Sequence, residues 1–411
     1  MPQPLALALD IGTSRTIAIA GRAREDGFAA PEIVAVAGTN TTGMRKGRIS
    51  NFEFVEQTIR SVLARVEQRA RADFGTVAVV CSGGDVDSAT VERSVPLCGE
   101  REASGVVTPA AVSSLLEAVD GTEPPDGRVA IANARQYFAI DDRPEEIAEP
   151  VDMEGRSLRC KAIVAHMPSA HWDDIEDVVE KAGAVAEWPV FPPLAAGLHA
   201  VSRQRREDGV LCIDFGGGTT SWCAFYRNHP VAMGAIPVGG DHVTNDLLLA
   251  FRPGSTQAAE NLKIAHGRAL PDGVPRETRV PLAPRGEGVG DGRTAQLYAV
   301  SQVVSARMDE TVRLVRSRLQ DSGTLPYMGS GVAICGRASR LAGLPELVSR
   351  VFAAPCDRMT FVSGDSKLDM EPDGFAAAWG ALRQAIRNDC KARAERAEKS
   401  VFRSFMHLFD R

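Results

Sequence analysis

The sequence predicts an α/β protein made of two similar domains, and a repeated hairpin is the main reason. An apolar run at residues 5–9 is followed by Asp10-Ile-Gly-Thr-Ser-Arg15 and by a strand at residues 16–20. About two hundred residues later, the apolar strand 210–213 runs into Asp214-Phe-Gly-Gly-Gly-Thr-Thr220 and the strand 221–226. One such hairpin occurs in many folds, whereas two copies indicate a duplicated domain.

The second hairpin has the composition of a phosphate loop. Glycine at 216, 217 and 218 allows a tight turn that brings backbone N–H groups against a phosphate, and Thr219 and Thr220 add hydroxyl donors. Asp214 ends its strand with a carboxylate directed at any Mg²⁺ that accompanies the phosphates. We therefore expect phosphates to be clamped between the two halves of the chain.

Composition excludes several classes of function. The chain has 411 residues, 44% of them hydrophobic and 24% charged, which is enough for two or more hydrophobic cores. A net charge of −6 argues against general nucleic-acid binding. The 8 cysteines and 7 histidines lack metal-ligand spacing, and without a signal peptide the cysteines indicate a reduced, cytosolic protein. No apolar run is long enough to span a bilayer.

Strands and amphipathic helices are expected around both hairpins. In the first half we expect strands at 32–37, 77–81 and 185–190, and helices at 52–72, 172–182 and 192–205, with Asn51 or Ser50 as the N-cap of the first helix. In the second half we expect a strand at 231–236, mostly loop at 271–292, a long helix at 294–317, a strand and turn at 331–343, and a helix at 374–386.

Residues 85–161 show a different pattern of predicted secondary structure from the chain on either side. Short β-like runs at 90–97, 135–140 and 157–164 surround one candidate helix at 109–118, with proline-rich loops between them. This pattern predicts a small α+β module inserted into the first domain. The module is either a surface for a partner or a structural elaboration, and the residues alone leave both interpretations open.

Three further features of the second half could hold the rest of a nucleotide. Gly239 and Gly240 form a second glycine turn between a strand and a helix, and Gly336 ends another strand. Glu260 and Lys263 lie one helical turn apart, so they form either an ordinary surface ion pair or a pair that holds ribose hydroxyls.

The C-terminal segment is amphipathic. Residues 388–399 are nearly all charge and alanine, and beyond them one helical arc of about 160° would be apolar, with Arg403 and His407 opposite. This pattern is typical of a helix that lies in a membrane interface; the alternative is a terminal helix docked on the protein itself. The predicted membrane residues are Val401, Phe402, Phe405, Met406, Leu408 and Phe409.

Taken together, these motifs resemble the FtsA family of bacterial cell-division proteins, within the actin-like ATPase superfamily. The resemblance runs from residue 5 to the tail. The matching stretches are Asp10-Ile-Gly-Thr-Ser14, Lys46-Gly47, Asp214-Phe-Gly-Gly-Gly-Thr-Thr220, Val238-Gly-Gly-Asp-His-Val-Thr-Asn-Asp246 and Ala259-Glu-Asn-Leu-Lys263.

The resemblance implies a duplicated actin-like, ribonuclease-H-like fold with a nucleotide cleft between the domains. Residues 1–84 and 162–206 would form the first domain, with 85–161 as the inserted subdomain. Residues 207–386 would form the second domain, with a smaller subdomain at about 240–325, followed by a charged linker at 387–400 and a membrane-targeting helix at 401–411.

The same resemblance implies ATP and Mg²⁺ as cofactors. Asp10 and Asp214 would hold Mg²⁺ through water and serve as the catalytic carboxylates. The implied nucleotide-binding residues are Gly12, Thr13, Ser14 and Arg15, then Gly216, Gly217, Gly218 and Thr219, and around the ribose and adenine Gly239, Gly240, Glu260, Lys263, Gly336 and Arg337.

Three departures from the family pattern concern hydrolysis and adenine binding. Arg15 stands where the first hairpin usually carries lysine, and Arg337 stands where a glycine usually follows Gly336, so that its side chain would crowd the adenine or stack on it. Pro192 replaces an acidic residue in a segment that helps position water in related ATPases. We therefore expect ATP binding with weak or absent hydrolysis.

The resemblance implies an adaptor that polymerises and tethers FtsZ filaments to the inner face of the cytoplasmic membrane at midcell. Its implied partners are the C-terminal peptide of FtsZ, other copies of this chain, anionic lipid and further divisome proteins. Two alternatives remain: a pilus-assembly actin-like ATPase that binds the tail of a membrane protein, and a small-molecule kinase of the same superfamily. The kinase would need a catalytic carboxylate beside a substrate pocket, and no motif supplies one.

Overall fold

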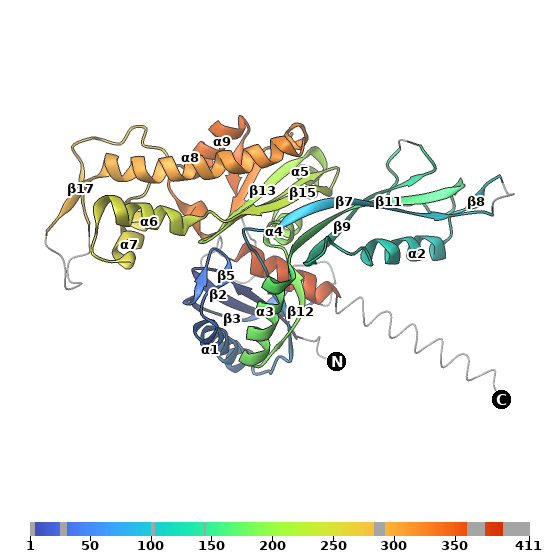
Figure 1. Ribbon diagram of the computed structural model, residues 1–411, viewed down its shortest axis with the longest axis horizontal. Helices are drawn as coiled ribbons and strands as arrows, with labels where there is room; N and C mark the ends of the chain where they lie inside the picture. Colours follow the sequence, from blue (N-terminus) through green and yellow to red (C-terminus); the bar gives the residue numbers. More distant parts are fainter. Residues whose placement is uncertain are drawn as a thin grey trace.

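Two domains built on five-stranded sheets face each other, and a third, smaller unit extends from them (Figure 1). The computed structural model describes residues 5–24, 31–99, 103–143, 145–282, 292–359 and 375–388. Within these ranges the fold is α/β.

The first domain is organised around the first hairpin. Its sheet has the order β12-β6-β1-β2-β3, in which β2 is antiparallel to β1 and β3, whereas β6 is parallel to β1 and β12. The strands are β1 Leu5–Ile11, β2 Arg15–Arg22, β3 Glu32–Asn40, β6 Thr76–Val80 and β12 Val185–Val190; a small ribbon, β4 Met44–Arg45 with β5 Arg48–Ile49, follows β3.

Successive side chains of a strand point to opposite faces of this sheet, and different helices cover the two faces. Leu7 and Leu9 pack against α1 (Phe52–Ala70) and α3 (Ser169–Ala182). Ala6 and Ala8 pack against the 376–388 helix on the opposite face, where their small side chains admit a close approach. The predicted N-cap of α1 is confirmed, because the side chain of Asn51 accepts a hydrogen bond from the backbone N–H of Phe54.

The second domain repeats this sheet strand for strand. Its order is β19-β18-β13-β14-β15, with β14 antiparallel to β13 and β15, and β18 parallel to β13 and β19. The same order and the same directions around both hairpins confirm the predicted duplication. The strands are β13 Val210–Phe215, β14 Thr220–Tyr226, β15 His229–Ile236, β18 Val332–Cys335 and β19 Cys356–Arg358.

Helices cover both faces of the second sheet. Leu211, Ile213 and Phe215 pack toward α6, α8 and α9, whereas Cys212 faces α4. The elements of this domain and its connections are α4 Pro192–Ala200, α5 Arg203–Asp208, α6 Gly240–Phe251, α7 Thr256–His266, β16 Arg279–Pro281, β17 Thr294–Gln296, α8 Leu297–Asp321, η1 Leu325–Tyr327, η2 Arg337–Arg340 and α9 Leu344–Phe352.

The third unit is a three-stranded sheet, β7-β11-β9, with one helix packed on it. Leu115 and Val119 of that helix join Phe138, Ile140 and Leu158 in a separate small core. Its elements are β7 Asp87–Pro96, β8 Gly105–Val106, α2 Pro109–Asp120, β9 Arg128–Ile140, β10 Glu154–Gly155 and β11 Ser157–Pro168.

Two expected elements differ in the structure. The helix expected at 192–205 is two helices, because Val201 is extended and the Ser202 side chain caps a new helix by accepting from the N–H of Arg205. The long helix expected from residue 294 begins at Leu297, because residues 294–296 pair with β16 as β17. Residues 389–411, which include the predicted tail helix, lie outside the described residues. Among the helices that are described, none is long and apolar enough to cross a membrane.

Candidate functional site

The two hairpins close with the same hydrogen bond and meet face to face. Gly12 N–H donates to the carbonyl of Arg15, and Gly216 N–H donates to that of Thr219, both at 3.0 Å. A Cβ atom on Gly217 would lie 2.0 Å from Oγ of Ser14, so any larger residue here would displace the Ser14 hydroxyl. The duplicated turns therefore form the two walls of one narrow site.

Asp10 and Asp214 meet at the bottom of this site. They line a cavity of about 80 Å³ together with residues of both hairpins. Burial raises the pKa of Asp10 to about 8, with a further contribution from the charge of Asp214, and burial raises the pKa of Asp214 to about 6. Two ionised carboxylates are costly here without a cation, and oxygen ligands of this kind suit Mg²⁺.

Gly336 closes the site from the end of β18. Its φ of +85° is in the left-handed region, and a Cβ atom would lie 2.2 Å from Oδ1 of Asp214 and 2.5 Å from the carbonyl oxygen of Phe215. A side chain at this position would therefore strain the backbone and displace the carboxylate.

The start of α6 is attached directly to the second hairpin. Gly240 N–H donates to the carbonyl of Gly216 at 2.9 Å, and Asp241 N–H donates to that of Gly217 at 2.8 Å. A Cβ atom on Gly239 would collide with both of these carbonyls. The glycine turn thus fixes α6 against the phosphate-loop hairpin.

Lys263 is a buried amine in the wall beside α6. Its Nζ donates to the carbonyl of Gly240 at 3.1 Å and to Oγ1 of Thr244 at 2.9 Å, and forms an ion pair with Glu260 at 2.6 Å. The predicted contact between Glu260 and Lys263 is confirmed. The side chain of Lys263 is only 8% exposed and that of Glu260 is 29% exposed, so this is a partly buried pair rather than an ordinary surface pair. The bonds from Lys263 to Gly240 and Thr244 brace α7 against α6.

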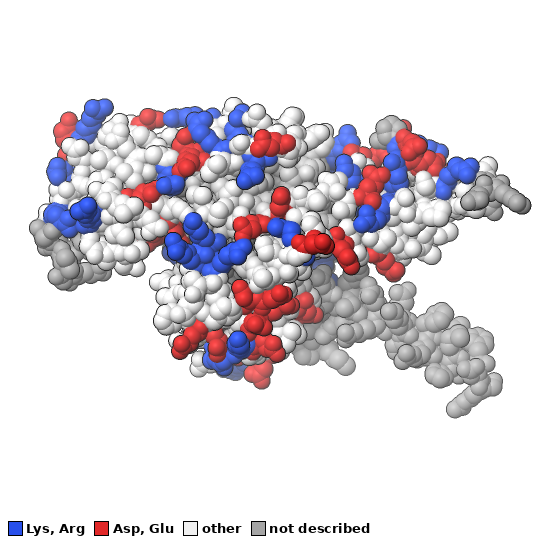
Figure 2. Space-filling model, viewed as in Figure 1, with Lys and Arg blue, Asp and Glu red and all other residues white. Residues whose placement is uncertain are grey.

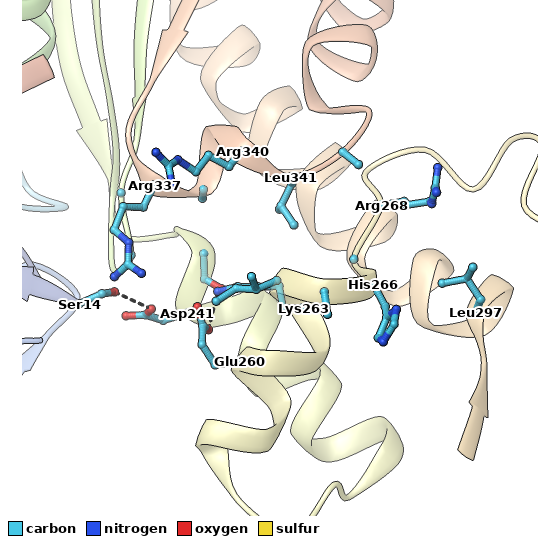
Figure 3. Close-up of a pocket in the computed structure, with 18 residues that line it drawn as sticks. Ser14, Asp241, Glu260, Lys263, His266, Arg268, Leu297, Arg337, Arg340 and Leu341 are labelled. Atoms are coloured by element: carbon cyan, nitrogen blue, oxygen red, sulfur yellow. Dashed lines mark hydrogen bonds and ion pairs between the residues drawn. The ribbon is translucent and has the colours of Figure 1, made fainter. Parts of the chain in front are cut away.

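A cavity of about 300 Å³ opens beyond Lys263, between α7 and η2. Figure 3 shows Glu260 and Lys263 on one side and Arg337, Arg340 and Leu341 on the other. Arg337 points toward Ser14 and Asp241 at the hairpin end of the cavity. Its guanidinium therefore lies nearer the expected phosphate position than the sequence predicts.

The outer mouth of the cleft is basic. Arg45 and Lys46, on the β4–β5 ribbon, are among the residues that line a cavity of about 770 Å³. Figure 2 shows Lys and Arg side chains gathered in this part of the surface, where the two domains meet. A positive entrance attracts polyphosphate ligands.

One contact across the cleft has no signal in the sequence. Ser14 Oγ donates to Oδ1 of Asp241 at 3.0 Å, joining residues of different domains (Figure 3). Thr13 also accepts from the N–H of Gly47 at 3.0 Å, and the carbonyl of Gly47 contacts Nε2 of His171 at 2.9 Å. Asp241 and His171 were not among the predicted site residues, because each depends on how separate segments pack.

Every predicted cleft residue except Gly239 lines one of these three cavities, and Gly239 packs directly behind the second hairpin. Pro192 lines the smallest cavity, beside the two carboxylates. Ser82 also lines this cavity, although it was not among the predicted site residues. Its Oγ lies 3.5 Å from Oγ1 of Thr219. The six predicted membrane residues at 401–409 lie outside the described part of the chain.

Comparison with known proteins identifies similar sequences among cell-division proteins. Residues 211–378 match the family described as "Cell division protein FtsA". The chain is 30% identical to the FtsA protein of Pseudomonas aeruginosa over 85% of its own length and 82% of that protein. It is 26% identical to FtsA of Escherichia coli strain K12, over 85% of this chain and 82% of that one.

Solved structures with the same fold are more distant in sequence. A chain of the PilM–PilN type IV pilus biogenesis complex matches with a TM-score of 0.61 at 17% identity, over 94% of this chain and 99% of that one. MreB5 of Spiroplasma citri bound to ADP matches with a TM-score of 0.55 at 14% identity, over 95% and 98%. These likenesses establish the actin-like fold.

Proposed function

The chain belongs to the FtsA family of cell-division proteins, and from this premise we propose that it is an ATP-binding adaptor that tethers FtsZ filaments to the membrane. The observation that carries the nucleotide part is the pair of partly buried carboxylates, Asp10 and Asp214, between two phosphate-loop hairpins. Their raised pKa values indicate a site in need of a cation, which Mg·ATP supplies together with its phosphates.

The residues divide along the cleft by what they can bind. Asp10 and Asp214 would hold Mg²⁺, which would neutralise the phosphates. Backbone N–H groups and hydroxyls of both hairpins would hold the phosphates, with Arg337 directed toward them. The cavity of about 300 Å³ between α7 and η2 would take the nucleoside, with Glu260 close enough to its mouth to accept from ribose hydroxyls.

We expect slow hydrolysis, because the described lining of the cavity around Asp10 and Asp214 offers no further carboxylate to activate water. Among the described residues that line the innermost cavity, the acidic ones are Asp10 and Asp214, which the proposal assigns to the cation. Pro192 contributes a ring with no proton acceptor. A bound nucleotide that persists suits an adaptor, which needs a stable conformation more than turnover.

The membrane and FtsZ parts of the proposal rest on the tail pattern and on family membership. The apolar arc at 401–409 would insert into the headgroup region, and the folded domains would bind FtsZ and further copies of the chain. Other divisome proteins would then be recruited at the midcell membrane.

Co-sedimentation tests the proposal directly. The full chain, Asp214→Asn and Phe405→Glu are each mixed with phosphatidylglycerol vesicles and FtsZ, and binding of a fluorescent ATP analogue is measured with and without Mg²⁺. We expect FtsZ to pellet with the full chain, Phe405→Glu to lose the vesicles, and Asp214→Asn to lose Mg²⁺-dependent nucleotide binding. Nucleotide binding without either vesicles or FtsZ would refute the adaptor and favour the pilus-type alternative.

A further inference from the structure

Five basic side chains lie around the C-terminal end of α4. We name His199, Arg203, Arg206, Arg383 and Arg387 the α4 basic cluster. They come from three elements: α4 itself, α5, and the 376–388 helix that crosses α4. None of them belongs to the nucleotide cleft.

Close packing brings these elements together. A Cβ atom on Gly380 would lie 2.6 Å from the carbonyl carbon and oxygen of Ala195, so the 376–388 helix touches α4 backbone to backbone at this point. Arg383 and Arg387 follow Gly380 at three and seven residues and share its face, whereas His199 follows Ala195 by one turn. The two helices therefore place these three groups beside one another.

Arg206 fixes the end of α4 from the other side. Its guanidinium donates to the carbonyls of Leu198 at 3.1 Å and of Gly197 at 3.3 Å, and also to that of Val201. These bonds satisfy carbonyls at a helix C-terminus, which favours a cation. Arg203 is exposed at the start of α5, close enough for its charge to lower the pKa of Arg206.

In the part of the chain that the structure describes, no carboxylate is paired with the arginines that the 376–388 helix adds to the cluster. Burial and the positive charges of Arg383, Arg206 and Arg387 lower the pKa of His199 to about 3. Within the described ranges, neither Arg383 nor Arg387 has a carboxylate within ion-pair distance, whereas the neighbouring Arg205 is paired with Asp357 at 2.8 Å.

The opposite side of the first sheet is acidic. α3 packs on the face of the sheet away from the 376–388 helix and exposes Asp173, Glu176, Asp177 and Glu180. Figure 2 shows Asp and Glu side chains gathered over α3. An anionic surface would attract one side of this domain and repel the other.

We propose that the α4 basic cluster binds the phosphate headgroups of anionic lipids and so determines which side of the first domain faces the membrane. This inference rests on the proposed tethering. Residues 389–400 connect the 376–388 helix to the predicted amphipathic segment and span at most about 40 Å when fully extended. Binding of that segment therefore keeps the cluster near the bilayer.

The test uses the full chain and two double variants. Arg383→Gln with Arg387→Gln removes two charges from the cluster, and Arg316→Gln with Arg318→Gln removes two exposed charges from α8 as a matched control. Binding is measured to neutral phosphatidylcholine vesicles and to vesicles with added phosphatidylglycerol. Since each basic side chain near an anionic surface contributes about a fivefold gain, we expect the cluster variant, which lacks two of them, to bind phosphatidylglycerol vesicles about 25-fold more weakly. Neutral vesicles should bind all three proteins equally.

Two further arms separate the cluster from the tail and lipid from free phosphate. In the Phe405→Glu background we expect weak, salt-sensitive binding to phosphatidylglycerol that the cluster variant removes. If Phe405→Glu leaves vesicle binding unchanged, the proposed membrane anchor at residues 401–409 is wrong, whereas the proposal for the α4 basic cluster is still tested by its own variant. If the cluster variant and the control bind phosphatidylglycerol vesicles equally, the cluster proposal is wrong. Calorimetry with inorganic phosphate gives a second test: if the cluster variant loses only its binding of inorganic phosphate and still binds the vesicles, the proposal is also wrong. A full chain that binds neither kind of vesicle would overturn both.

Discussion

Neutralising Asp10 should stabilise the nucleotide-free protein while destroying its response to Mg²⁺. The substitution Asp10→Asn keeps the size of the side chain and removes a charge that the folded chain holds at a cost. Folding raises the pKa of this carboxyl from 3.8 to about 8, mainly by burial and further by Asp214. The folded protein therefore retains a proton that the unfolded chain has already released.

The sign and size of the effect follow from this difference in bound protons. Stability from a raised carboxyl pKa is fully present below the unfolded value and is lost as pH rises toward the folded value. For Asp10, four pKa units correspond to about 6 kcal/mol across the whole interval. Asp214 is half ionised near pH 6, so from about one pH unit above that value the pair's slope comes almost entirely from Asp10. The slope from Asp10 is about −1.4 kcal/mol per pH unit well below its folded pKa and falls to about half of this at about pH 8.

Urea unfolding between about pH 6 and about pH 8 measures this slope. Over this interval we expect the stability of Asp10→Asn relative to the parent to rise by about 2 kcal/mol in total, and added Mg²⁺ to stabilise the parent alone. Asp173→Asn, on the exposed face of α3, is the control and should leave the slope unchanged. If the free energies of unfolding of the parent and of Asp10→Asn change in parallel with pH, the reasoning is wrong, because the Asp10 carboxyl would then have the same pKa in the folded and unfolded protein.

Three further substitutions test the walls of the cleft. Lys263→Met leaves Glu260 without its cation and should cost about 2 kcal/mol, seen as a melting temperature lowered by several degrees in thermal unfolding. Gly336→Ala should cost about 2 kcal/mol or more, because the new methyl group strains the backbone and meets a carboxylate; urea unfolding measures this, and an unchanged midpoint would contradict it. Asp241→Asn removes a negative charge beside the Ser14 hydroxyl and should tighten ATP binding by about fivefold in a fluorescence titration, whereas weaker binding would show that this carboxylate supports the ligand.

The sequence predicted the parts of the fold that repeat or that follow local rules. Two Asp-containing hairpins were enough to infer the duplication, because their glycines and strand-ending carboxylates recur at the same spacing. The ion pair between Glu260 and Lys263 followed from helical periodicity. The break between α4 and α5 was missed, although Ser202 was a possible N-cap and the apolar pattern ends at Val201.

Contacts between separate segments could not be predicted from periodicity. The bond from Ser14 to Asp241 joins the first hairpin to the start of α6 in the other domain, and its existence depends on how far the domains close. The α4 basic cluster likewise depends on Gly380 meeting Ala195, which fixes where the following arginines lie. In both cases the residues themselves are ordinary polar or charged side chains whose meaning comes from packing.

The proposed ligand would act on the relation between the two domains. Two partly buried carboxylates oppose folding of the ligand-free protein as pH rises, and one hydrogen bond from Ser14 joins the first hairpin to the start of α6. A cation would neutralise the two carboxylates, and phosphates would compete for the hydroxyl of Ser14. The free energy of ligand binding would therefore act on how the two domains sit relative to each other. Because the innermost cavity offers no spare base among its described lining, that conformation would persist after binding. A persistent, ligand-dependent relation between domains is what an assembling tether requires, since each copy must present the same surface to the next.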